Sequence, residues 1–528
     1  MELTPRANVG IAAAILVAAG AVYSIRLSAP FEHYHENVTA CYANWGRNYL
    51  RFGYGASSGA PIKATGIRPE SGPPVPRQLY THRPPTVSLL LSVACRMFGA
   101  TEATLRGFGV VASLATLAVF MVLARRLLGP AWGLAASALF AFIPDFAFYG
   151  VAVAHQTFGI LGALSILLAA LRWQERPGGG RLAALLATTM VACWLDWPAF
   201  YGAGAAGLLI VLTAGERRWI GVLVPAAAVA SLGLFVVYLW RLDPVGLVAV
   251  KDFLSTGSTH SGAVPIGGYL AAHVREAIRW FTIPVLLLAA VGAGRLRPRG
   301  NPADLAILLT GLLGADSVLF SSLTYGHLFM TVPLVPFAAL AAARGLRALS
   351  EARTLRLVAA AMVLGFAAQA GLTLRRAHAA ERYPYYGEAT RALASTLKST
   401  VARHERVLVR ITVDKHVLSY YADRPAALYS TASRTLDWLD EVRLEDGVDD
   451  EAVLRLLEMP ERPFSWVVTT TLPLASERLA TVRGVTEEFA QRNYDFESER
   501  SPSTLVTRLR ARFPESRRDG FLFFDLRR

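Results

Sequence analysis

Residues 31–48, FEHYHENVTACYANWGRN, gather four ionisable side chains within five positions, namely Glu32, His33, His35 and Glu36. The cluster follows the first long apolar run of the chain, residues 9–23. A carboxylate next to a membrane span is unfavourable unless it meets water, a partner or a metal ion. The cluster is therefore either an ordinary surface boundary or a working site, in which a carboxylate serves as a general base.

A second candidate for chemistry is the stretch Tyr80-Thr81-His82-Arg83-Pro84-Pro85, a basic pair in front of two prolines. It opens an apolar segment, residues 86–98, that is too short to cross a bilayer and is expected to lie along the membrane interface. Cationic side chains at this depth, with a carboxylate nearby, suit the recognition of a lipid-linked phosphate.

The composition indicates which elements must position these residues. The chain has 528 residues, 53% of them hydrophobic and 17% charged, which is typical of a polytopic membrane protein. The net charge of +14 comes mostly from arginines. These arginines lie between apolar segments, as membrane orientation requires, so we do not expect nucleic-acid binding.

The apolar runs predict a polytopic α-helical membrane domain of about 11 spans, with borders that extend into flanking small residues. We interpret the run at 9–23 as an uncleaved first helix and not as a secretory signal. The predicted spans cover residues 9–23, 105–123, 131–148, 157–171, 182–194, 199–214, 220–239, 281–291, 303–320, 328–343 and 355–374.

Arginines occupy every second short turn between these runs, which predicts that those turns and the N-terminus are cytoplasmic. The turns at 149–156, 195–198 and 321–327 contain no Lys or Arg and are predicted to face outward, as are the loops at 26–85 and 241–280. With this orientation all 10 histidines lie on the outer side. Either loops simply hold polar residues, or the histidines share a site.

The apolar runs stop near residue 375, and alternating elements predict a soluble, extracytoplasmic α/β domain. We expect helices at 388–403 and 449–457, and strands at 406–411, 465–470 and 521–526. The predicted domains are thus residues 1–374, a transmembrane domain with the outer loop 26–85, and residues 375–528. The tail has no GxGxxG, P-loop or CxxC motif, so we expect no cofactor site there.

Five stretches resemble the polytopic C-type (GT-C) glycosyltransferases, a family that includes protein O-mannosyltransferases and the bacterial lipid A aminoarabinose transferase. They are HENVTACYANWGRNYLRFG, YTHRPPTVSLLLSVACRMFGATEATLRGFGVVASLATLAVFMVLARRLLG, ALFAFIPDFAFYG, LDWPAFY and TYGHLFMTVPLVPFAALAAARG. The resemblance covers roughly residues 10–345 in outline. Their order and spacing are more specific than any one of them.

The resemblance implies a bacterial inner-membrane enzyme that transfers a sugar from a polyprenyl-phosphate carrier to a lipid, glycan or protein acceptor outside the membrane, with inversion. It implies that Glu36 is catalytic, with Glu32 as a less well aligned neighbour. His82 and Arg83 match the position of a basic residue that contacts the lipid phosphate. Arg106 matches a recurrent arginine, for which packing and phosphate contact are both open.

The chain departs from the family in the second outer loop, where relatives often have a second acidic residue. Gln156 stands there, preceded by His155. A neutral glutamine cannot replace an anionic ligand of a divalent metal. Either His155 takes over, or the reaction needs no metal, or activity has been altered or lost, so a divalent cofactor is left open.

Four further residues complete the candidate set. Asp145 and Asp196 are acids near outer span ends, and Asp196 before Trp-Pro favours a helix cap over catalysis. Tyr325 and His327 lie in the last short outer turn, either in the lipid-phosphate or sugar pocket or as interfacial packing.

Two other functions compete with glycosyl transfer. One is a non-catalytic membrane scaffold or sensor with the same fold, which Gln156 favours and which Glu36, His82 and Arg83 oppose. The other is a transporter of lipid-linked glycans, for which we find neither the inverted repeats nor the broken charged helices expected.

Overall fold

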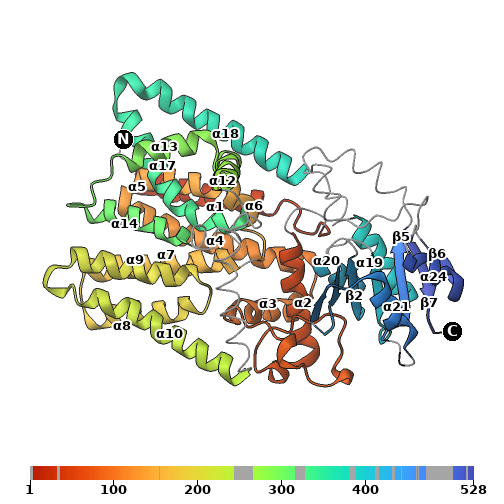
Figure 1. Ribbon diagram of the computed structural model, residues 1–528. Coiled ribbons are helices and arrows are strands. Elements are labelled where there is room, and N and C mark those ends of the chain that lie inside the picture. Colours follow the sequence, from red (N-terminus) through yellow and green to blue (C-terminus); the bar gives the residue numbers. More distant parts are fainter. Residues whose placement is uncertain are drawn as a thin grey trace. The chain divides into compact units, whose positions relative to one another are not determined.

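The computed structural model describes residues 4–31, 36–153, 155–242, 266–315, 328–379, 388–410, 415–430, 434–441, 443–459, 461, 463–470, 504–518 and 521–527. The chain divides into two compact units. Residues 1–29 and 81–378 form the helical unit, and residues 30–80 and 379–528 form the sheet unit. Figure 1 labels the elements of each.

The described part of the helical unit consists mainly of α-helices (Figure 1). Short 3-10 helices connect several of them, among them η4 (Gly215–Arg217), η6 (Gly311–Gly314) and η7 (Leu328–Leu334). The α-helices are α1 (Pro5–Tyr23), α3 (Thr86–Phe98), α4 (Glu102–Leu128), α5 (Pro130–Phe142), α6 (Pro144–Tyr149), α7 (His155–Glu175), α8 (Gly179–Cys193), α9 (Pro198–Thr213), α10 (Ile220–Leu242), α12 (Ile266–Trp280), α13 (Ile283–Ala293), α14 (Pro302–Thr310), α17 (Val335–Glu351) and α18 (Arg356–Ala379).

Local sequence signals explain where α4, the longest of these helices, begins and ends. The hydroxyl of Thr101 accepts a hydrogen bond from the Thr104 N–H, and Glu102 lies in the positively polarised first turn. Arg125 lies in the last turn, and Gly129 follows with φ +82°, a conformation that suits glycine. The helix end is thus encoded in the residues at the turn.

Each predicted span overlaps a described helix, although residues 316–320 of the span 303–320 lie outside the described residues, and the helices differ in length. Six are long and apolar enough to cross a membrane, or up to seven if the bent pair 273–280 and 283–293 counts as one span. The predicted total of about 11 spans stays a prediction. The predicted interfacial segment 86–98 is one helix, α3, with Pro85 before it and Gly99 after it.

Glycines allow two helices of this unit to pack backbone against backbone. A Cβ added at Gly292 of α13 would lie 1.8 Å from the carbonyl oxygen of Ala341 in α17. A Cβ at Gly345 of α17 would lie 2.0 Å from the carbonyl oxygen of Leu288. Reciprocal close contact of this kind is characteristic of small residues at helix interfaces in membranes.

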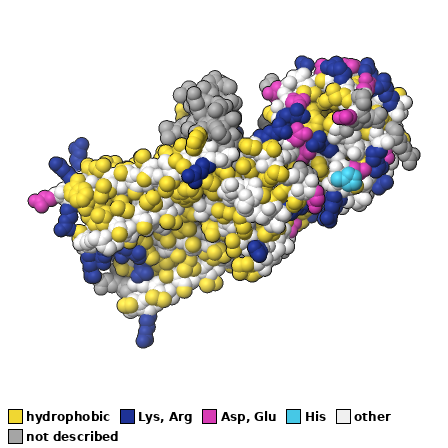
Figure 2. Space-filling model, turned by 90° about the horizontal axis from the view of Figure 1, so that it is seen from below, with side chains coloured by type: hydrophobic (Ala, Val, Ile, Leu, Met, Phe, Trp, Pro, Cys, Tyr) yellow, Lys and Arg dark blue, Asp and Glu magenta, His cyan; other side chains and the backbone are white. Residues whose placement is uncertain are grey.

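Apolar side chains cover much of the surface of the helical unit. Only 17% of the α18 segment and 22% of the α1 segment are buried, against 72% of the α7 segment. Leu357 and Leu364 of α18 are 84% and 70% exposed. Figure 2 shows this continuous hydrophobic surface, with Lys and Arg gathered at one end of the helical unit. Such a surface is stable in lipid and unfavourable in water, so the unit is a membrane domain.

The sheet unit contains a seven-stranded mixed sheet in the order β4-β3-β2-β1-β5-β7-β6. β1 is parallel to β2 and to β5, and the other neighbouring pairs are antiparallel. The strands are β1 (Val407–Arg410), β2 (Ala426–Ser430), β3 (Thr435–Trp438), β4 (Arg443–Asp446), β5 (Trp466–Thr470), β6 (Glu515–Arg518) and β7 (Phe521–Asp525). The helices are α2 (Glu36–Phe52), α19 (Glu388–Thr400), α20 (Lys415–Ala422), α21 (Asp450–Glu458) and α24 (Thr504–Arg512).

Helices cover both faces of the sheet. Along β1, Val407 and Val409 belong to the core beneath α19 and α20, whereas Leu408 belongs to the core beneath α21 and α24. This alternation is the period-2 pattern of a strand buried on both faces. The five elements predicted for the tail correspond to α19, β1, α21, β5 and β7, whereas β2, β3, β4, β6, α20 and α24 were not predicted.

The first outer loop, which the sequence analysis grouped with the transmembrane domain, folds as part of the sheet unit between residues 30 and 80. The ring of Phe31 lies 5.1 Å from that of Tyr420, and the Asn44 amide donates to the carbonyl oxygen of His416. The Thr65 N–H donates to the carbonyl oxygen of Leu439. These contacts join α2 and its following loop to α20 and to the β3 end.

Candidate functional site

Arg83, predicted to contact a lipid phosphate, forms an ion pair with Asp196 within the helical unit. Arg83 Nη1 lies 2.6 Å from Asp196 Oδ1, and the side chains are 15% and 1% exposed. The N-cap residue of α9 is Trp197, one position after Asp196, and it makes no side-chain capping hydrogen bond, so a capping role for Asp196 stays a prediction. The pairing was not predicted, because Arg83 and Asp196 are 113 residues apart. The carboxylate fixes the orientation of the guanidinium through a charge-assisted hydrogen bond.

The residues around this pair explain its position. Pro84 and Pro85 are buried and lead directly into α3, so His82 and Arg83 occupy the turn before a helix start. Asp196 precedes Pro198, the first residue of α9. A Cβ added at Gly159 of α7 would lie 2.7 Å from Pro198 Cδ and 3.0 Å from Asp196 Cβ. The glycine therefore allows α7 to approach the turn that carries Asp196.

Arg106, the next predicted donor-binding residue, contacts main-chain oxygens. Its Nη1 donates to the carbonyls of Arg26 and Leu27 at 3.1 and 3.3 Å, and also to Ala29. The side chain is 7% exposed. Of the two roles left open by the sequence, this geometry fits packing, because the guanidinium satisfies carbonyls in the turns after α1. Phosphate contact by Arg106 stays a prediction.

Gln156, at the position of the missing acid, lies in the first turn of α7 and is 7% exposed. Its neighbour Thr157 donates its hydroxyl to the carbonyl oxygen of Gly150 at 3.0 Å, and Ser113 of α4 donates to the same oxygen at 2.6 Å. The start of α7 is thereby joined to the turn after α6. His155 is the first residue of α7.

Asp145, one of the further acids, is completely buried at the start of α6 and accepts a hydrogen bond from the Thr331 hydroxyl of η7 at 2.9 Å. One turn further along α6, the ring of Tyr149 lies 4.8 Å from that of Trp280, the last residue of α12. The structure therefore brings α6, η7 and α12 together. Tyr325 and His327, which precede η7, lie outside the described residues.

Glu36, the predicted catalytic base, is the first residue of α2 in the sheet unit and is half-buried. The positive end of a helix dipole favours a negative charge at that position. Asn48 fixes the other end of α2, because its amide donates to the carbonyl oxygens of Ile62 and Ala64, both at 2.8 Å. Glu32, with His33 and His35, lies outside the described residues.

No group of three or more His, Cys, Asp or Glu side chains suited to hold a metal ion occurs among the residues that the structure describes. The acid and histidines before Glu36 are not among these residues. The divalent cofactor that the sequence leaves open at His155 and Gln156 therefore stays a prediction.

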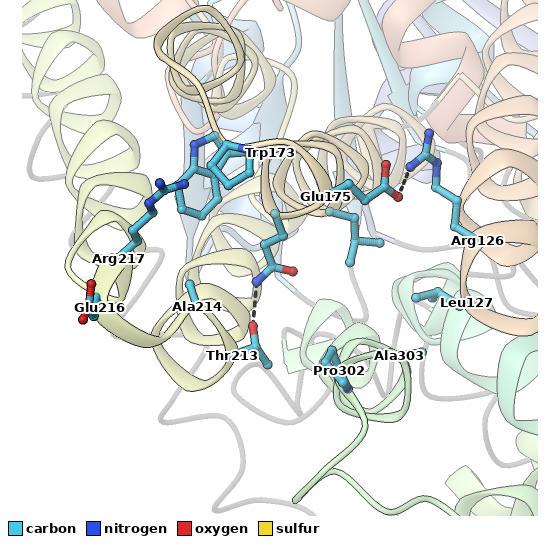
Figure 3. Close-up of a pocket in the computed structure, with 13 residues that line it drawn as sticks. Arg126, Leu127, Trp173, Glu175, Thr213, Ala214, Glu216, Arg217, Pro302 and Ala303 are labelled. Atoms are coloured by element: carbon cyan, nitrogen blue, oxygen red, sulfur yellow. Dashed lines mark hydrogen bonds and ion pairs between the residues drawn. The ribbon is translucent and has the colours of Figure 1, made fainter.

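A cavity of about 680 Å³ lies at the end of α9 remote from Asp196 (Figure 3). The ends of α4, α7 and α9 and the start of α14 line it, and Arg126 forms an ion pair there with Glu175. The Gln174 amide donates to the Thr213 hydroxyl at 2.6 Å. Turns predicted to be cytoplasmic thus meet at one end of the helical unit, which agrees with their predicted location on one side of the membrane.

No family model matches the chain, and no curated protein matches it in sequence. Among solved structures it resembles the crystal structure of ArnT from Cupriavidus metallidurans bound to undecaprenyl phosphate, with a TM-score of 0.57 and 16% identity. The similarity covers 90% of this chain and 95% of that chain. The chain shares the fold of that ArnT structure. The apo structure of the same ArnT matches with a TM-score of 0.54, also at 16% identity and over the same shares of the two chains.

This shared fold supports, at the level of architecture, the resemblance predicted from the sequence. The similarity extends beyond the membrane helices, because 90% of the chain cannot be covered without a large part of the sheet unit. At 16% identity the individual site residues are not transferred by this similarity. Their roles have to be argued from their own chemistry.

Proposed function

We propose that the chain is a membrane glycosyltransferase that transfers a hexosyl or pentosyl group from a polyprenyl-phosphate carrier to an acceptor on the extracytoplasmic side. The observation that carries this proposal is the similarity over 90% of the chain to an ArnT structure that holds undecaprenyl phosphate. The polar candidate residues Arg83, Asp196 and Glu36 supply the groups that such a transfer needs.

In the proposed reaction Glu36 acts as the general base. The acceptor hydroxyl oxygen attacks the anomeric carbon, the bond from that carbon to the phosphate oxygen breaks, and the phosphate leaves with the electron pair. The hydroxyl proton passes to the Glu36 carboxylate. The anomeric carbon develops oxocarbenium character on the way, and one displacement inverts its configuration.

Arg83 and His82 are proposed to stabilise the charge that collects on the leaving phosphate. The ion pair with Asp196 supports this role, because a guanidinium fixed through one edge loses less side-chain entropy when it binds an anion. In the proposal Tyr325 and His327 complete the donor pocket, and Arg106 stabilises the turns after α1.

The proposed location is the bacterial inner membrane, with the N-terminus in the cytoplasm and the sheet unit outside. The arginine-bearing turns that meet at the cavity in Figure 3 support the assignment of that end to the cytoplasm. The acceptor approaches from the extracytoplasmic side and is a lipid, a glycan or a protein.

A panel of polyprenyl-phosphate sugars, offered to the purified chain with divalent metal and with chelator, tests this function. Release of polyprenyl phosphate from at least one donor is expected, and the chelator arm decides between a metal site at His155 and a metal-free reaction. Binding of the donors without any turnover would favour the second candidate, a non-catalytic membrane scaffold, for which the neutral Gln156 is the specific argument.

A further inference from the structure

Three arginines of the sheet unit converge on one carboxylate. Asp423 lies directly after α20. Its Oδ2 atom lies 2.5 Å from Arg51 Nη2 and 2.9 Å from Arg68 Nη2. Arg47 Nη2 lies 3.7 Å from Oδ1. Asp423 is the carboxylate to which all three pair in the part of the chain that the structure describes. Three guanidinium charges against one carboxylate leave two positive charges in excess.

The cluster is half-buried, so water neutralises this excess only in part. The side chains of Arg47, Arg51 and Arg68 are 20%, 18% and 20% exposed, and that of Asp423 is 16% exposed. Burial lowers the pKa of Arg47 to about 10, an effect that Asp423 opposes and that Arg51 and Arg68 reinforce. Arg47 is nevertheless charged at neutral pH. A second anion beside Asp423 would relieve the mutual repulsion of the three guanidinium groups.

The arginines are held in place by contacts that do not involve Asp423. Arg47 donates to the carbonyl oxygens of Tyr420 and Ser419 at 2.9 and 3.1 Å, which lie in the last turn of α20. Gly66, with φ +72°, lies against the backbone of Arg424, where an added Cβ would approach the carbonyl carbon to 2.2 Å. The loop that carries Arg68 is therefore closely packed against the residues that follow α20. A site ordered in advance binds an anion without a large entropic cost.

The cluster contains more arginines than are needed to neutralise one carboxylate. A single arginine satisfies a carboxylate in a bidentate pair, and Arg47 already serves the carbonyls at the end of α20. Each of the three side chains retains exposed surface on the sheet unit. A planar guanidinium with free N–H groups is the preferred partner of phosphate oxygens.

We propose that Arg47, Arg51 and Arg68 form a phosphate-binding site on the sheet unit, made of residues other than His82 and Arg83. Asp423 holds the three guanidinium groups together and limits the affinity, because it repels the incoming anion. The phosphate comes either from a soluble phosphate monoester or from the headgroup of an anionic lipid. The site does not depend on the proposed glycosyl transfer, since it rests on residues of the sheet unit alone.

Isothermal titration of the full chain in detergent with inorganic phosphate and phenyl phosphate, at constant ionic strength, tests the soluble source. The lipid source is tested by association of the chain with nanodiscs of phosphatidylglycerol compared with phosphatidylcholine. The variants are Arg51→Gln, Asp423→Asn and Arg51→Lys. The matched control is Arg443→Gln on β4, which removes one positive charge from the same unit at a side chain that is 43% exposed.

Binding in either arm should weaken at least tenfold in Arg51→Gln, strengthen several-fold in Asp423→Asn and stay within twofold in Arg443→Gln. Arg51→Lys keeps the charge and should retain part of the affinity, which separates loss of the site from loss of the fold. The proposal is overturned if the native chain binds phosphate in neither arm, or if Arg443→Gln weakens binding as much as Arg51→Gln. Failure of the donor assay leaves this outcome unaffected.

Discussion

The ion pair between Arg83 and Asp196 makes a quantitative prediction about the helical unit. The two side chains meet at 2.6 Å, with Asp196 only 1% exposed and Arg83 15% exposed. The informative changes are Asp196→Asn, Arg83→Gln and the double variant. Asparagine and glutamine keep most of the volume, so none of these changes leaves a large cavity.

The two single variants are expected to differ. Arg83→Gln leaves a buried carboxylate without its cationic partner, which costs about 3–5 kcal/mol. Asp196→Asn leaves a guanidinium that reaches solvent, so water screens it and the loss is smaller, about 2 kcal/mol. The double variant contains no buried charge at this place, so its loss should fall short of the sum by about 2 kcal/mol.

The assay is unfolding of the purified chain by SDS in mixed micelles, followed by tryptophan fluorescence, from which the free energies of unfolding of the four proteins are compared. Additivity of the two single losses to within about 0.5 kcal/mol would refute the reasoning, because independent sites behave in that way. A larger loss of unfolding free energy in Asp196→Asn than in Arg83→Gln would contradict the view that Asp196 is the more buried charge of the pair.

Three further predictions concern packing and pH. Gly345→Ala should destabilise the helical unit by about 1–3 kcal/mol, because the new Cβ would lie 2.0 Å from a carbonyl oxygen of α13. The control Gly371→Ala, where a Cβ meets no atom within 4 Å, should be nearly neutral in the same SDS titration. Gly66→Ala should lower the thermal stability of the sheet unit more than Gly59→Ala. Both glycines have a positive φ, but only at Gly66 would a Cβ clash with backbone atoms. Equal losses in the two variants would contradict this prediction. Burial lowers the pKa of His416 to about 3, so the unfolded chain alone takes up its proton below about pH 6.5. The free energy of unfolding therefore falls by about 2 kcal/mol between pH 7 and pH 5 because of His416. In His416→Gln the melting temperature should decrease less over the same pH range.

Local signals mark the ends of two helices of the membrane domain. The prolines before residue 86 and the glycine at 99 delimit α3, whose predicted and observed bounds coincide. Thr101 and Gly129 do the same for α4. These residues act on their immediate neighbours in the chain, so their effect is visible in the sequence itself.

Contacts between distant residues were not predictable in the same way. Asp423 and Arg51 are 372 residues apart, and no periodicity relates them. Their ion pair belongs to the network that makes residues 30–80 part of the sheet unit. The strands β3, β4 and β6 are as short as β1, β5 and β7 but lack their apolar runs, so the sequence alone does not mark them as strands.

The candidate site shows both situations. The residue types at Glu36, His82 and Arg83 could be singled out from their neighbours in the sequence. Asp196 could be noticed only as an acid before Trp-Pro, and the local rule for that pattern predicts a helix cap. Its ion pair with Arg83 depends on the approach of the turn before α3 to the turn before α9, which the fold decides.

We propose above that this chain cleaves a polyprenyl-phosphate sugar with Glu36 as the base. The most direct measurement is the rate of polyprenyl phosphate release from a labelled donor by the native chain, by Glu36→Gln and by Glu70→Gln, an exposed glutamate of the same loop region. We predict turnover by the native chain and by Glu70→Gln, and a loss of about 10²–10⁴-fold in Glu36→Gln with unchanged donor affinity. Full activity of Glu36→Gln, or no turnover of any donor by the native chain, would contradict the claim.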